Sequence, residues 1–450
     1  MMSMSPSRWI GSTLLLGAFA TAGALTTVQD ASAGTCPDWD LAIGQPGLSS
    51  NAWDMVEHDG DWYVAGQFTT AGGQSANRVA RWDGHSWHPL GTGMNGQASA
   101  IEVYNGEIHV SGGFLTAGGV DAFRIARWDG ANWHEVPGID SAFNCRVLTV
   151  FGESLMMGGE IFEANGQQVN NITRWDGQSW HPLGAGVSSP PDAFGTVHDR
   201  VFALKTIGDD LIVGGQFISA GGVTVNRIAR WDGEHWHALG DGLAFSVHAI
   251  EWHNGQLIAG GDLSDCAFCQ GRVSRWVPEN QDEPFGAGQW EQMGSIFDRP
   301  VHALEIYQGE LIVGGSFTTN GPVIANLLAK WDERIEDWTE IGGGLTDTVQ
   351  PVPSVRTLGV YDGQLIASGI FNRVGEDALI ANRIVAWEGC PEDLVGDING
   401  DGVVDVFDLL ELLGNWGACP DCGACPADLD GNCEVDVFDL LLLLENWTSV

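Results

Sequence analysis

The chain has 450 residues, and its 59 Asp and Glu outweigh 19 Lys and Arg to give a formal net charge of −40. Only 17% of the residues are charged and 44% are hydrophobic, so the chain can bury a core and is not a disordered acidic tail. Because this acid excess repels phosphates and anionic lipids, we expect no nucleic-acid partner and no binding to an anionic membrane surface. The same negative charge makes cations suitable ligands for this protein.

Residues 1–33 are predicted to be a secretory signal peptide. Arg8 precedes an apolar run over 9–24, and Ala31-Ser32-Ala33 supplies the small-residue cleavage pattern. A transmembrane anchor is disfavoured because the run is short and interrupted by Gly and Thr, and no later stretch is long enough for a membrane span. We therefore expect a secreted or cell-surface protein, in which disulfides can form.

Residues 34–390 contain an internal repeat. Most copies have a Gly-Gly pair. Each copy then has Arg-Trp-Asp-Gly or a degraded version of it, and all but the seventh have a second Trp after it. The second Trp recurs every 46 to 56 residues, at Trp87, Trp133, Trp180, Trp236, Trp290 and Trp338.

Each copy is predicted to form four short strands. In the second copy, Asn105-Gly106 and Asp129-Gly130 are dipeptides typical of two-residue hairpin turns, and each separates two runs with strand character. Four antiparallel strands per copy are typical of a propeller blade, whereas a β-sandwich would not repeat so regularly. We therefore predict an all-β, seven-bladed β-propeller over residues 34–390.

The N-terminal strand is expected to complete the seventh blade. Residues 39–44 match the segment that begins at Trp87, and Trp39 precedes Trp87 by 48 residues, one repeat period. Such pairing would remove the free sheet edges. Cys36 and Cys390 would then lie at the same end of the blade, and we predict a disulfide between them; pairing of either with the C-terminal cysteines is the alternative.

The other cysteines leave several pairings open. Cys266 and Cys269 are close enough in sequence to pair locally, and Cys145 is the expected unpaired thiol. The remaining four fall in the C-terminal segment, where disulfides are favoured over a zinc site in an exported chain: Cys419, Cys422, Cys425 and Cys433.

The repeats resemble those of kelch-like and galactose-oxidase-like propellers. They are most similar to the Gly-Gly-x-Phe…Trp-Asp-Gly…Trp repeats of fungal Rax-type polarity markers and of many exported bacterial proteins. The resemblance implies a fold and not an activity.

We predict no catalytic residue on the propeller. Tyrosine ligands would be needed for copper-radical chemistry, but Tyr104, Tyr307 and Tyr361 share one repeat position, which indicates a structural role. The Asp of each Trp-Asp-Gly also recurs and is expected to fix the hairpin turn. The recurring acids and histidines are Asp83, Asp129, Asp176 and Asp232; His88, His134, His181 and His237; His248 and His302; and His58 and His253.

Residues 391–450 carry the clearest chemical pattern. They contain 14 acids and no Lys or Arg. Two twelve-residue loops place oxygen ligands at positions 1, 3, 5, 9 and 12 and a backbone carbonyl at position 7, the arrangement that Ca²⁺ prefers. The sequence therefore predicts two calcium ions, held by Asp397, Asn399, Asp401, Val403, Asp405 and Asp408, and by Asp428, Asp430, Asn432, Glu434, Asp436 and Asp439.

A predicted helix follows each loop, over 406–416 and 437–447, and no helix precedes either loop. This tandem loop-helix pattern resembles a type I dockerin, which implies a small α-helical, calcium-binding domain over 391–450 with a cohesin partner. Loop positions 10 and 11 depart from the family, because Val406-Phe407 and Val437-Phe438 replace small hydroxyl residues. Calcium binding therefore carries over from the resemblance but ordinary cohesin pairing does not, and the expected partner at the tail is cohesin-like or lies at the cell surface.

Two functions follow from these patterns. The favoured one is a secreted, non-catalytic binding or scaffold protein, whose propeller recognises an unknown protein or polysaccharide and whose tail attaches or assembles it. The alternative is a polysaccharide-degrading enzyme or its accessory subunit, since dockerin-like modules often accompany such enzymes. The lack of a non-repeated acid pair in the sequence favours the first.

Overall fold

The computed structural model divides the chain into two compact units, of which residues 36–394 form one and residues 395–450 belong to the other. The structure describes residues 39–190, 199–263, 269–280, 283–321, 323–349, 352–375 and 378–388 of the first unit. Of the second it describes residues 396, 398, 404, 406–419, 425–430, 432–445 and 447. The predicted signal peptide, residues 1–33, lies outside the described residues.

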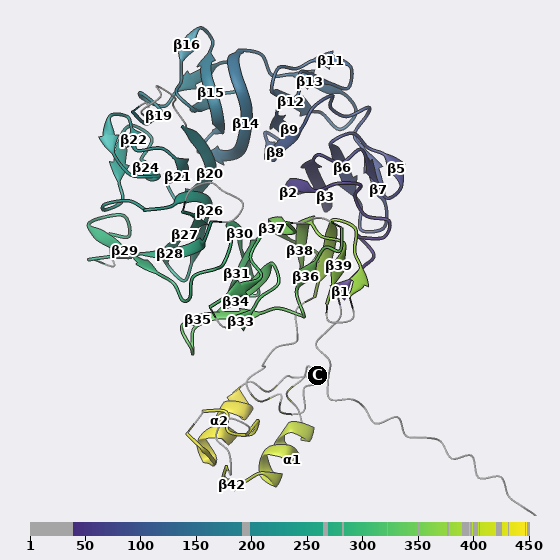
Figure 1. The fold of residues 1–450 in the computed structure, drawn as a ribbon, viewed down its shortest axis with the longest axis vertical. Coiled ribbons are helices and arrows are strands. Elements are labelled where there is room, and N and C mark those ends of the chain that lie inside the picture. Colours follow the sequence, from purple (N-terminus) through teal and green to yellow (C-terminus); the bar gives the residue numbers. More distant parts are fainter. Residues whose placement is uncertain are drawn as a thin grey trace, which may run out of the picture. The chain divides into compact units, whose positions relative to one another are not determined.

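The first unit is built from small antiparallel sheets arranged around a ring (Figure 1). Within the described residues, six of these sheets have four strands and one has five. The first three, from the innermost strand outward, are β2 (Ala52–His58), β3 (Asp61–Gly66), β6 (Val79–Trp82) and β7 (Trp87–Pro89); β8 (Ala98–Tyr104), β9 (Glu107–Gly112), β12 (Ile125–Trp128) and β13 (Trp133–Glu135); and β14 (Ile139–Phe151), β15 (Ser154–Ala164), β17 (Ile172–Trp175) and β18 (Trp180–Pro182), with β16 (Gln167–Gln168) beside β15.

The other four sheets continue this order along the chain. They are β20 (Arg200–Ile207), β21 (Asp210–Gln216), β24 (Ile228–Trp231) and β25 (Trp236–Ala238); β26 (Ser246–His253), β27 (Gln256–Asp262), β28 (Gly271–Pro278) and β29 (Gly288–Gln292); β30 (Val301–Tyr307), β31 (Glu310–Gly315), β34 (Leu328–Asp332) and β35 (Asp337–Glu340); and β37 (Ser354–Tyr361), β38 (Gln364–Ile370), β41 (Ile384–Trp387) and β1 (Trp39–Asp40). The prediction of a propeller made from four-stranded antiparallel blades is confirmed.

Short sheets of two or three strands lie outside the blades. Their strands come from the segments that connect the second and third strands of a blade or that follow its last strand. They are β4 (Thr70–Ala71) with β5 (Gln74–Ser75); β10 (Thr116–Ala117) with β11 (Val120–Asp121); β19 (Val187–Ser188) with β22 (Ser219–Ala220) and β23 (Val223–Thr224); β32 (Thr319–Asn320) with β33 (Val323–Ile324); and β36 (Leu345–Thr346) with β39 (Arg373–Val374) and β40 (Leu379–Ile380).

The innermost strands contact one another in chain order, and the last, β37, contacts the first, β2. The N-terminal strand β1 pairs with β41, with Trp39 opposite Trp387. Trp39 is buried and donates from Nε1 to the carbonyl oxygen of Gly342 at 2.8 Å. The predicted Cys36–Cys390 disulfide lies outside the described residues.

The repeated tryptophans hold blades together. In five blades, the Trp before Asp and the second Trp face each other across the outer hairpin, with ring centroids 5.2 to 5.4 Å apart. The second Trp also donates from Nε1 to a carbonyl oxygen of the preceding repeat, as Trp133 does to Leu90 at 2.9 Å. These Trp residues therefore serve the core and the contacts between blades.

Close backbone approach explains the Gly-Gly pair. A Cβ on Gly215 would lie 2.0 Å from the carbonyl oxygen of Arg200 on the neighbouring strand, so no larger residue fits. The phenylalanine two residues later, Phe217, is buried in the core of its blade. The repeat motif thus encodes a tight strand pair followed by a core side chain.

The second unit holds two short helices, α1 (Val406–Gly414) and α2 (Val437–Glu445), which contact each other. The strands β42 (Gly417–Ala418) and β43 (Glu434–Val435) pair beside them. Leu412 and Leu443 are fully buried and form part of the small core.

The cysteines of the second unit favour disulfides over zinc. Cys419 and Cys425 form a disulfide, and Cys433 is disulfide-bonded as well, as is Cys269 of the propeller. Cys145 is a free, buried thiol, as expected, and burial raises its pKa to about 12. No helix within the described residues is long and apolar enough to cross a membrane.

Candidate functional sites

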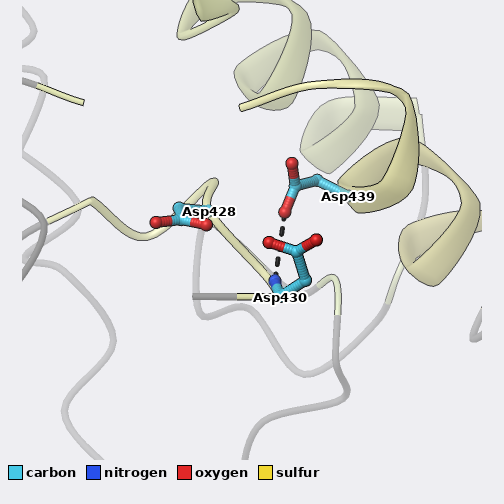
Figure 2. A group of neighbouring side chains, drawn as sticks. All are labelled: Asp428, Asp430 and Asp439. Carbon is cyan, nitrogen blue, oxygen red and sulfur yellow. Dashed lines mark hydrogen bonds between the residues drawn. The ribbon is translucent and has the colours of Figure 1, made fainter. Parts of the chain in front are cut away.

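Three carboxylates of the second predicted calcium loop converge in the tail. One oxygen each from Asp428, Asp430 and Asp439 lies within 4.8 Å of the other two. Figure 2 shows the three side chains. Carboxylate oxygens at this separation fit a hard cation such as Ca²⁺. The expectation that this acidic loop has a cluster suited to a metal ion is confirmed.

Asp439 also organises the loop around this cluster. Its side chain is fully buried, and its Oδ1 accepts hydrogen bonds from the backbone N–H groups of Leu429 and Asp430 at 2.7 and 3.1 Å. Its Oδ2 accepts from the N–H of Asp436 at 2.7 Å, and Asp436 Oδ1 in turn accepts from the N–H of Phe438. This reciprocal capping starts α2 and fixes the position of Asp439.

The loop turn forms although a cysteine occupies the position where the first loop has Gly402. Cys433 has a φ of +73°, in the left-handed region that favours glycine. Asp428 holds this turn, because its Oδ1 accepts from the N–H of Asn432 at 3.0 Å and its Oδ2 from the N–H of Cys433 at 2.8 Å. Asn432 Oδ1 accepts from the N–H of Glu434.

Only the end of the first predicted loop can be compared. Asp408 is fully buried, and its Oδ1 accepts from the N–H of Ile398 at 2.8 Å, which matches the bond from Leu429 to Asp439 in the second loop. The other predicted ligands of this loop lie outside the described residues: Asp397, Asn399, Asp401, Val403 and Asp405.

The repeated acids of the propeller stabilise turns, as predicted. Asp83 Oδ1 accepts from the N–H groups of His85 and Ser86 at 2.9 and 2.8 Å, and its Oδ2 lies 2.6 Å from His88 Nε2. The hydrogen bond from His88 and those from the backbone hold the pKa of Asp83 well below its usual range. The same His–Asp distance recurs at Asp129, Asp176 and Asp232.

The repeated tyrosines join neighbouring blades. Tyr104 donates its hydroxyl hydrogen to the carbonyl oxygen of Glu153 at 2.9 Å, and Tyr361 donates to Gly60 at 3.0 Å. Tyr307 donates to Gly363 at 3.0 Å. In the fifth blade His253 takes this position, with Nε2 2.9 Å from the carbonyl oxygen of Gly309.

Sequence reasoning missed a ring of side chains at the centre of the propeller. Each innermost strand has a β-bulge at the same position, and the bulged residue lines a central cavity of about 270 Å³. These residues are Trp53, Ser99, Arg146, Phe202, His248, His302 and Arg356. The sequence contains one signal for this ring: the repeat position that these residues occupy has a different residue type in nearly every copy.

A second set of charged residues stands three positions after the bulge, at Glu102, Lys205, Glu251 and Glu305. Lys205 Nζ donates to Glu251 Oε2 at 2.6 Å. Burial, and then the charge of Glu251, raises the pKa of Glu305 to about 7. Burial likewise raises the pKa of Glu102 to about 7.

Glu305→Gln is expected to stabilise the propeller at high pH only. The raised pKa means that ionising Glu305 disfavours the folded state, and this penalty grows as pH rises from the ordinary value near 4.5 to about 7. We expect the free energy of unfolding to increase by up to about 3 kcal/mol at pH 8 and to change little at pH 4. Chemical unfolding at both pH values measures this, and an equal effect at both would contradict the electrostatic explanation.

The comparison with family models agrees with the propeller. Residues 58–82 match a family model described as a domain of unknown function (DUF5122) beta-propeller. The crystal structure of the computationally designed Ika8 protein is similar at 13% sequence identity and a TM-score of 0.42, covering 78% of this chain and 99% of that one. No curated protein matches the sequence.

Proposed function

We propose that this chain is an exported, non-catalytic binding protein. Its seven-bladed propeller, closed by the N-terminal strand, recognises a protein or a glycan, and its dockerin-like tail binds two calcium ions and attaches the propeller to a partner. The convergence of Asp428, Asp430 and Asp439 is the observation that carries this proposal, because three carboxylates this close repel one another unless a cation joins them.

The surface of the two tail helices supports attachment. Five apolar side chains are exposed at corresponding positions of each half, and Phe407 and Phe438 are 63% and 60% exposed. Large apolar side chains gathered on so small a unit are typical of a surface that docks against another protein. The full set is Val406, Phe407, Leu410, Leu413 and Trp416, and Val437, Phe438, Leu441, Leu444 and Trp447.

The alternative function, polysaccharide degradation, has less support. The Asp residues of the Trp-Asp-Gly turns, the His residues beside them and the recurring Tyr residues make hydrogen bonds within turns or between blades, which accounts for their presence without catalysis. Release of soluble reducing sugar from plant or algal polysaccharides by the purified protein would favour this alternative over a binding role.

A sedimentation assay tests the proposed function. The mature protein is mixed with insoluble polysaccharides or cell-envelope preparations, with calcium or with EGTA, and sedimented. We expect sedimentation that requires calcium, and its loss in the double variant Asp428→Asn with Asp430→Asn. Glu434→Gln is the matched control, because it removes one charge from the same loop at a position expected to use its backbone carbonyl. Sedimentation unaffected by EGTA would contradict calcium-dependent attachment.

A further inference from the structure

We propose that the central cavity of the propeller binds a small carboxylate of monosaccharide size, with the carboxylate held by the guanidinium group of Arg356. The inference deepens the proposed binding role of the propeller and rests on it. It assigns a ligand class to the ring of bulged residues. The residue type at this position differs between copies, so the repeat itself does not require a cationic or aromatic side chain there.

Two donors in the cavity have no acceptor. Within the described part of the chain, Arg356 makes no hydrogen bond or ion pair, and its Nε is buried. Trp53 Nε1 is also buried without an acceptor, and the guanidinium of Arg356 lies 5.5 Å from the centre of the Trp53 ring. Because both of these nitrogens are closed off from solvent, the remaining N–H groups of the Arg356 guanidinium are the donors that a ligand in the cavity can reach, and such a ligand presents acceptors.

The other charged groups around the cavity are already compensated. Arg146 donates to Glu160 Oε1 at 2.8 Å, and His248 Nε2, which makes no hydrogen bond within the described residues, lies 3.2 Å from the carboxylate oxygen Oδ2 of Asp262. His302 Nε2 lies 2.9 Å from Ser316 Oγ, and burial lowers the pKa of His302, which keeps it neutral.

Asp54 is the acid that lines this cavity. Its two oxygens accept hydrogen bonds from the N–H groups of Met55 and Ile101, both at 2.9 Å. Burial raises the pKa of Asp54 to about 7, so its negative charge is incomplete at neutral pH. Arg356 is therefore the cation that no neighbouring carboxylate neutralises, and an anion is the ligand that it favours.

The rest of the lining favours an organic acid over a bare ion. Phe202 stacks on His248, with ring centroids 4.6 Å apart, and with Trp53 it gives the cavity two aromatic walls. A volume of about 270 Å³ holds one sugar ring or one aromatic ring but not an extended chain. A uronic acid and an aromatic carboxylate share the required features, a carboxylate and an apolar face.

Isothermal titration of the calcium-loaded mature protein tests this assignment. The probes are glucuronate, benzoate, glucose and inorganic sulfate. We expect glucuronate, benzoate or both to bind and glucose not to bind, because only the acids offer a carboxylate to Arg356. Binding of one acid alone identifies which source supplies the carboxylate.

Variants connect the binding to the cavity. Arg356→Gln is expected to weaken binding roughly 10- to 100-fold, since it removes a charged donor, and Trp53→Phe to weaken it by less, since it keeps an aromatic wall in the cavity. Arg334→Gln is the control, because the Arg334 side chain is 80% exposed on an outer hairpin. Thermal unfolding of each variant shows whether it remains folded.

Three results would overturn the assignment: no binding of either acid, equal binding of glucose, or binding of sulfate alone. Unchanged affinity in both Arg356→Gln and Trp53→Phe would do so as well. Calcium binding by the tail is measured on the same samples. If the tail binds calcium and sedimentation depends on it while the cavity binds no carboxylate, this inference fails and the proposed function stands.

Discussion

Calcium is expected to protect the amides of residues 428–445 from hydrogen exchange, and EGTA to remove this protection. Without a cation, Asp428, Asp430 and Asp439 repel one another at a separation below 4.8 Å, and the loop and the start of α2 depend on the same carboxylates. The free energy of calcium binding therefore adds to the free energy of folding of this segment. At a calcium concentration a hundredfold above the dissociation constant, the gain is about 2.7 kcal/mol.

Paired variants separate a calcium site from a general charge effect. Asp428→Asn with Asp430→Asn should abolish the response of residues 428–445, whereas Glu434→Gln should retain it, although both changes reduce the acid excess of the loop. Hydrogen exchange followed by mass spectrometry resolves this segment from the rest of the chain. A response retained in the double variant would place the cation elsewhere.

Trp39→Ala is expected to destabilise the propeller by about 3–5 kcal/mol, the usual cost of deleting a buried aromatic side chain. β1 has two residues, so its contribution to the last blade depends largely on Trp39, which packs 6.2 Å from Trp387 between ring centroids. The variant also removes the hydrogen bond to Gly342 and leaves an edge of β41 unpaired.

Chemical unfolding monitored by tryptophan fluorescence measures this effect. Trp416→Ala is the control, since Trp416 is 50% exposed and belongs to the tail unit, so it should leave the propeller transition unchanged. A Trp39→Ala protein that unfolds at the wild-type denaturant concentration would show that β1 does not stabilise the last blade.

The blades were predictable because the same physical requirements recur in each. Asn105-Gly106 adopts positive φ at both residues, as its hairpin requires, and Asp83 and its equivalents fix the outer turn. One match to such a pattern is weak evidence, but repetition at a constant period shows that the residues serve the fold. The Tyr position was assigned a structural role by the same reasoning.

That reasoning could not locate the ring of residues at the centre of the propeller, for a physical reason. His248 and His302 share a repeat position, which suggested a structural role, yet the bulge there turns each side chain toward the central cavity. A bulge arises from the way in which two strands pair, and the residues around it have no characteristic composition that would reveal it in the sequence. The unpartnered donors of Trp53 and Arg356 become visible only when the blades surround the cavity.

In the tail, the spacing of the acidic residues predicted which carboxylates would lie close together but not which hydrogen bonds each would make. Asp439 was expected as a ligand at loop position 12, and it also accepts three backbone hydrogen bonds that shape the loop. The positive φ of Cys433 shows that the turn tolerates a residue other than glycine when Asp428 holds the surrounding backbone.

The calcium content of the mature protein at equilibrium is the most direct test of the account. Dialysis against buffered calcium, followed by elemental analysis, should find two ions per chain in the wild type and in Glu434→Gln, and one in the Asp428→Asn, Asp430→Asn double variant. A wild-type protein that binds no calcium at saturating concentration would contradict the account.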